Sequence, residues 1–132
     1  MRVEIIDKQD KRNPLNGTKV TSSTKLSELL DGLASRDPFF LELIGDNGYK
    51  LLVGVGKLMG CVQYSPSNGA PPYLMAVESP ATESEGDVDF WISSELTPVP
   101  KRFCLPFDRV KEIAAHFLET GDRSPKLSWE EI

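Results

Sequence analysis

Residues 50–64, KLLVGVGKLMGCVQY, contain glycines and a lysine that could surround a phosphate group. A phosphate-binding loop places its glycines where a strand turns into a helix, so that backbone N–H groups converge on the anion. Here the next residues, MGCVQYS, are predicted to form a strand, and Lys57 is not followed by serine or threonine. The segment therefore predicts a β-hairpin that turns through Lys57 and Leu58, with Gly54 and Gly56 allowing a bend or bulge.

Proton transfer near neutral pH is usually carried by histidine, and this chain has a single one, His116. A helix turns by about 100° per residue, which places His116 on the flank of a predicted helix, away from its apolar face. Asp87 and Asp89 share one face of a predicted strand, where they could bind a hard cation or act as acid and base. Such a pair more commonly marks a solvated surface, and we expect no catalytic residue, cofactor or metal ion.

The two aspartates belong to the stretch DVDFWIS, in which alternate residues face opposite ways. The face that carries Phe90 would join the core, whereas Asp87, Asp89 and Trp91 would share the other face. Two acids beside an aromatic residue are typical of contact with a basic groove on another protein. The alternative is a half-exposed edge strand with solubilising charges.

Acidic residues are concentrated in this part of the chain. The net charge is −5, and no lysine or arginine lies between Lys57 and Lys101. An acidic stretch repels nucleic acid and attracts a basic partner, so we expect a protein partner with a basic groove, and neither a nucleic-acid nor a membrane partner. The candidate contact residues are Glu78, Glu83, Glu85, Asp87, Asp89 and Trp91.

Two segments have the apolar spacing of amphipathic helices. In the first, four leucines between residues 26 and 33 follow serine and threonine capping residues and precede Asp37-Pro38, where proline disfavours further helix. The second begins near residues 106–108, carries Phe117 on its apolar face and ends at Gly121. Each helix is predicted to pack one face on a core.

The other apolar segments are predicted to be strands separated by turns. They are residues 3–6, 17–22, 38–45, 49–56, 59–65, 73–79, 87–93, 101–107 and 125–129. Because short connections make neighbouring strands antiparallel, we predict an α+β fold with a single antiparallel β-sheet and two amphipathic helices packed against it. One domain would span residues 1–132, with residues 8–17 as a mobile loop.

The length of 132 residues suits one domain with one core. Cys61 and Cys104 stand in apolar runs, which predicts buried reduced thiols and favours a reducing compartment. The charged N-terminus lacks the apolar region of a secretion signal, and no stretch reaches the roughly 18 apolar residues of a membrane span. We expect a cytoplasmic protein, monomeric or weakly dimeric. Trp129 would anchor the C-terminal segment on the core, with partner contact as the alternative.

The order of these features resembles the first-numbered family of bacterial immunity proteins, found in polymorphic toxin and contact-dependent inhibition systems. The most specific parts are the closing module LPFDRVKEIAAHFLETGDRSPKLSWEEI and the glycine-containing strand 51–56, and the runs KVTSSTKLSELLDGL and DVDFW accompany them. The likeness runs from about residue 17 to the end of the chain, and the first fifteen residues depart from the pattern. Order and spacing carry it, rather than one motif.

The resemblance implies a small non-enzymatic α+β protein that binds and neutralises a toxin domain, frequently a nucleic-acid deaminase or a nuclease, encoded beside it. Such a protein protects the producing cell and its kin. The acidic stretch is consistent with this function, because a nucleic-acid-modifying toxin has a basic substrate groove that an acidic surface can occupy. The alternative function is a small-ligand or metal-binding α+β module that uses Asp87, Asp89 and His116.

Overall fold

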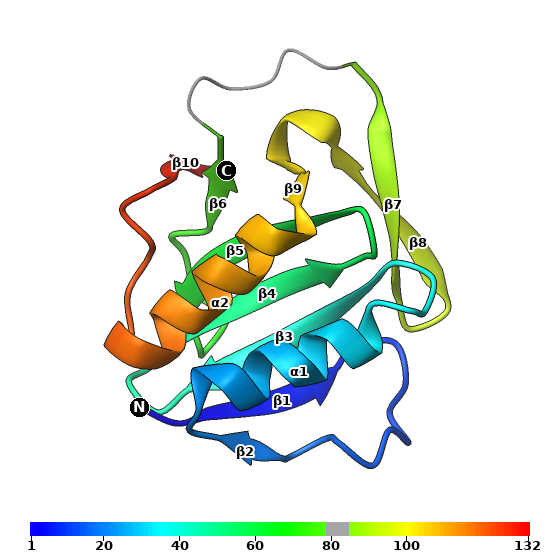
Figure 1. Ribbon diagram of the computed structural model, residues 1–132. Helices are drawn as coiled ribbons and strands as arrows, with labels where there is room; N and C mark the ends of the chain where they lie inside the picture. The colour runs from blue at the N-terminus through cyan, green and yellow to red at the C-terminus, as the bar shows by residue number, and fades with distance from the viewer. Residues whose placement is uncertain (79–84) are drawn as a thin grey trace.

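The computed structural model describes residues 1–78 and 85–132, which form two helices and a ten-stranded sheet (Figure 1). The strands are β1 (Val3–Asp7), β2 (Lys19–Val20), β3 (Phe39–Gly45), β4 (Tyr49–Val55), β5 (Met59–Pro66), β6 (Leu74–Val77), β7 (Asp87–Ile92), β8 (Glu95–Pro100), β9 (Leu105–Pro106) and β10 (Ser128–Glu131). The helices are α1 (Ser23–Leu33) and α2 (Phe107–Thr120), with a short 3-10 turn, η1 (Lys101–Phe103). The predicted α+β class is confirmed.

Within the described residues, all strand pairs but one are antiparallel. The main path of the sheet runs β10-β6-β5-β4-β3-β1-β2, and β9 pairs with β5. Where β1 ends at Asp7, opposite Leu41, the same edge of β3 continues with β7, in parallel, through Phe39 and Trp91. β8 then pairs with β7 as an antiparallel hairpin. The edge of β3 is therefore shared by two strands far apart in the sequence.

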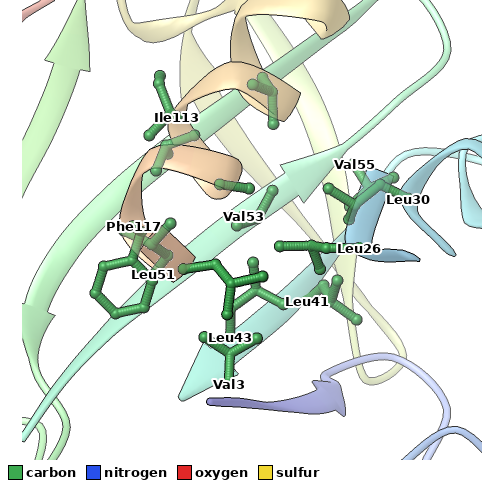
Figure 2. Close-up of a cluster of buried hydrophobic side chains, with 14 of the residues drawn as sticks. Val3, Leu26, Leu30, Leu41, Leu43, Leu51, Val53, Val55, Ile113 and Phe117 are labelled. Carbon is green, nitrogen blue, oxygen red and sulfur yellow. The ribbon is translucent and has the colours of Figure 1, made fainter. Parts of the chain in front are cut away.

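Both helices cover the same face of the sheet, and the main core fills the space between the helices and the sheet (Figures 1 and 2). The predicted one-sided spacing of the leucines is confirmed, because α1 buries Leu26, Leu30 and Leu33. Helix α2 likewise turns Ile113 and Phe117 toward the sheet. The strand residues that meet them in Figure 2 include Val3, Leu41, Leu43, Leu51, Val53 and Val55. No helix in the described ranges is long and apolar enough to cross a membrane.

A second, smaller core lies on the reverse face of the sheet, where side chains of the β7–β8 hairpin meet those of the central strands. Its buried members are Phe40, Cys61, Met75, Phe90, Val99 and Cys104. The rings of Phe40 and Phe90 lie with centroids 5.3 Å apart. Both cysteines are free and buried, as predicted. Burial is the main reason that the pKa of each thiol is raised.

Gly54 provides space for this second core. A Cβ atom at Gly54 would lie 2.6 Å from the Cys61 sulfur and 2.7 Å from the Phe90 ring. The predicted bend or bulge is not what this glycine provides, since Gly54 keeps regular pairing with Phe40 and Cys61. The predicted turn through Lys57 and Leu58 is confirmed, because β4 ends at residue 55 and β5 begins at residue 59.

The strands differ from the prediction in several places. Residues 95–100 form β8, although Pro98 and Pro100 argue against a strand; β8 pairs only with β7, and an edge strand tolerates proline. The single strand predicted over residues 101–107 divides into η1, β9 and the start of α2, since the Cys104 N–H donates to the Lys101 carbonyl in a tight turn. Strand 17–22 shortens to residues 19–20 because Ser22 caps α1 by accepting from the Lys25 N–H.

The C-terminal tryptophan anchors its segment, as predicted. Trp129 packs against the main core, and its indole N–H donates to the Ser124 carbonyl at 3.0 Å. Its ring meets the Tyr64 ring edge to face, with centroids 6.3 Å apart. The strand that carries it, β10, pairs with β6 and lies later than the predicted residues 125–129.

Candidate functional site

The predicted contact strand is β7, at one side of the molecule (Figure 1). Asp87 and Asp89 are exposed, whereas Phe90 is completely buried. β8 pairs with β7 along its length, but β3 reaches β7 only at Trp91. Among the described residues, the backbone from Asp87 to Asp89 therefore has a strand partner on one side alone. Its first half is an edge that presents two carboxylates to solvent.

Trp91 lies where this edge joins the sheet. Its backbone N–H donates to the Pro38 carbonyl at 2.8 Å, and its half-buried ring packs against the helix-side core. Phe90, the preceding residue, enters the reverse-face core instead. The two aromatic residues thus fix β7 against both faces of the sheet. Trp91 offers a partner less surface than a fully exposed ring would.

The remaining predicted contact residues lie before β7 and are not equivalent. Glu78 lies directly after β6, and its carboxylate is 3.3 Å from the Arg109 guanidinium on α2. Glu85 is exposed and precedes Gly86. Glu83 falls outside the described residues. The structure therefore gives Glu78 an internal partner and leaves Glu85 with Asp87 and Asp89 as exposed acids at this side of the molecule.

The charge of Asp87 acts on a neighbouring thiol. Burial raises the pKa of Cys104 to about 11, the negative charge of Asp87 adds to this rise, and Lys101 opposes it. Lys101 is held nearby because its backbone N–H donates to the Gly86 carbonyl at 3.0 Å. Lys101 therefore offsets part of the charge at the start of β7.

His116 lies apart from the acidic strand. It occupies the C-terminal half of α2, which packs over β4 and β5, whereas β7 lies at the opposite side of the view in Figure 1. The ligand-binding alternative requires His116 to lie near Asp87 and Asp89, and the fold does not bring these residues together. Within residues 1–78 and 85–132, no three histidine, cysteine or acidic side chains are grouped so that they could hold a metal ion.

The exposure of one residue, Leu58, was not predicted from the sequence. Leu58, in the turn between β4 and β5, has 82% of its surface exposed, more than Leu96, at 49%, next to the β7–β8 turn. Leu58 lines two hollows, of about 470 and 440 Å³. Val88 of β7 lines the second hollow, so this turn lies beside the acidic strand. The only sequence indication was a leucine placed in a turn, where polar residues are expected.

The fold and these surface features define a small α+β protein with an acidic edge strand and an exposed leucine at its surface. A family profile described as Immunity protein Imm1 matches residues 16–131. The chain belongs to this family of immunity proteins, which confirms the resemblance. No match to a curated protein was found.

Proposed function

We propose that this immunity protein binds a cognate bacterial toxin domain, a nucleic-acid deaminase or nuclease, and neutralises it by covering its active site. It acts in the cytoplasm, by contact and without catalysis of its own. The acidic contact surface consists of Glu78, Glu83, Glu85, Asp87, Asp89 and Trp91, with the exposed carboxylates of β7 at its centre.

The observation that carries this proposal is the exposure of Asp87 and Asp89 on a strand fixed by Phe90 and Trp91. An enzyme that acts on nucleic acid needs a positive groove for the phosphate backbone. Carboxylates on a fixed edge are attracted to such a groove, and this attraction speeds encounter between the two proteins. Family membership supplies the expectation that a toxin partner exists.

The test begins with co-expression of this chain and the toxin domain encoded beside it. We expect growth to be rescued and the two proteins to purify as a complex. Purified toxin should then lose its activity on nucleic acid when an equimolar amount of this chain is added, and excess substrate should slow complex formation. A toxin that stays active in the presence of this chain would contradict neutralisation. Inhibition that substrate does not oppose would contradict only the covering of the active site.

A further inference from the structure

The turn between β4 and β5 carries Leu58 outward on a closely packed backbone. A Cβ atom at Gly56 would lie 2.4 Å from the Met59 carbonyl oxygen, and one at Gly60 would lie 2.3 Å from the Gly54 carbonyl oxygen. The Phe107 N–H donates to the Leu58 carbonyl at 3.4 Å, which ties the turn to the start of α2. The backbone on both sides of Leu58 is therefore closely packed, and the exposed leucine projects from it.

The surroundings of Leu58 suit insertion into another protein. The hollow of about 470 Å³ is lined by Leu58, the end of α1 and the start of α2. The hollow of about 440 Å³ is lined by Leu58, residues 34–38 and Val88. Single exposed apolar residues are common, but here Met59, Val88 and Pro38, all half-buried, line the same hollow. A partner that encloses Leu58 would therefore bury a group of apolar side chains.

The apolar group reaches the acidic strand through Val88, whose backbone lies between Asp87 and Asp89 in β7 and whose side chain packs on the reverse-face core, opposite to the two carboxylates. Around Leu58 itself most charges are neutralised internally. Lys111 lies 2.9 Å from Asp31 and 3.6 Å from Asp108, and the Arg36 guanidinium binds Asp7 at 2.7 Å. Lys57 has no ion pair among the described residues. A partner thus meets a nearly neutral apolar projection beside exposed carboxylates.

We infer that Leu58 is the central apolar contact of the toxin interface. The surface of the toxin that receives it is an apolar socket next to a basic patch, the socket taking Leu58 and the basic patch facing Asp87 and Asp89. This inference rests on the proposed function and refines it: the acids govern the rate of encounter, and the leucine governs the lifetime of the complex. Full burial of a leucine side chain strengthens binding by about tenfold to a hundredfold.

The experiment measures binding of the inactivated toxin domain, encoded beside this chain, to the wild type and to Leu58→Asp. The matched control is Leu96→Asp, which places the same charge next to the other hairpin turn, where a leucine is also exposed. We expect Leu58→Asp to weaken binding at least tenfold through faster dissociation, and Leu96→Asp to stay within about twofold of the wild type. Thermal unfolding of Leu58→Asp should match that of the wild type, since 82% of Leu58 is exposed, whereas Leu96→Asp should unfold at a somewhat lower temperature because only 49% of Leu96 is exposed.

Lys57→Glu tests the chemistry of the partner. Beside a basic patch it should speed association, and slower association would overturn the assignment of a basic surface. Equal affinities of wild type and Leu58→Asp, or equal losses in both leucine variants, would overturn the role of Leu58 and leave the proposed function standing. A wild type that does not bind the toxin would overturn both. If Leu58→Asp instead converts a wild-type dimer into a monomer while toxin binding is unchanged, the projection is a self-association contact and the inference fails.

Discussion

At the scale of single residues, Gly54 is a position at which a small change has a large expected effect. The Gly54→Ala variant would force its methyl group against Cys61 and Phe90 at less than 3 Å. We expect it to lower the free energy of unfolding by about 1–3 kcal/mol, because the buried ring and sulfur must move. Urea unfolding measures this change.

A second glycine serves as a control, because its replacement by alanine should raise the free energy of unfolding. Gly32 lies inside α1, and apart from its chain neighbours and the nearby helix backbone, no atom of the described residues comes within 4 Å of the place that an alanine methyl group would occupy. Gly32→Ala should therefore stabilise the protein by about 0.5–1 kcal/mol through its helix propensity. Equal stability of Gly54→Ala and wild type would show that the reverse-face core can relax around the added methyl group.

Asp7 is the second residue with a measurable consequence. Its side chain is buried and accepts from Arg36, Asn13 and the backbone N–H groups of Gln9 and Asp10. Burial acts to raise its pKa, but these hydrogen bonds outweigh burial and hold the pKa below 3.8. The stabilisation by ionised Asp7 is therefore complete above about pH 4 and is lost as the pH falls through the lowered pKa.

We expect Asp7→Asn to be less stable at pH 7 and to lose less stability than the wild type between about pH 5 and pH 2. Urea unfolding at a series of pH values measures both effects. Asp10→Asn, an exposed change in the same loop, keeps the bonds to Asp7 and should follow the wild type. A wild-type acid dependence in Asp7→Asn would mean that other carboxylates control acid unfolding.

The mobility of residues 8–17 stays a prediction, which amide hydrogen exchange can measure.

At the scale of elements, the edge strand β7 allows the charge argument to be tested separately from the fold. Asp87→Lys combined with Asp89→Lys reverses two exposed charges and leaves Phe90 and Trp91 in place. We expect association with the toxin domain to slow by about tenfold or more at low salt, and the difference to shrink as salt screens the charges. Stopped-flow mixing at several salt concentrations measures it. An unchanged association rate would remove β7 from the interface and leave it as a solubilising edge.

The elements that could be predicted from the sequence are those with a one-sided pattern. Spacing alone indicated the buried sides of α1, through its leucines, and of β7, through Phe90. β8 could not be predicted, because its prolines are acceptable only when the strand lies at an edge, and that position depends on tertiary pairing. Leu58 was missed for a similar reason: its exposure depends on how the turn between β4 and β5 lies against the rest of the fold.

The candidate contact surface could be predicted only in part. Charge distribution pointed to Asp87 and Asp89, which the structure exposes. It could not show that Glu78 pairs with Arg109, since these two residues are far apart in the sequence and meet only when α2 lies over the sheet. It also could not show that Trp91 is half-buried, because that depends on the parallel contact between β7 and β3.

At the scale of the whole molecule, the N-terminal residues complete the sheet, although the family profile does not cover them. The profile begins at residue 16, yet β1 lies between β3 and β2 and buries Val3 and Ile5 in the main core. We expect a chain that starts at residue 16 to fail to fold cooperatively, because it exposes the edge of β3 and opens the core. Circular dichroism during heating measures this, with the full chain as reference. A cooperative transition in the shortened chain would show that β1 is dispensable.

The alternation of buried and exposed side chains along β7 has a consequence for how such proteins diversify. Phe90 is committed to the interior, whereas Asp87 and Asp89 contribute to neither core. If β7 contacts the toxin as proposed, substitutions at the two outward positions would change which toxin is recognised at little cost in stability, while the inward position stays constrained. Under that proposal, a lineage that meets a new toxin would alter its specificity by point mutation on an unchanged scaffold.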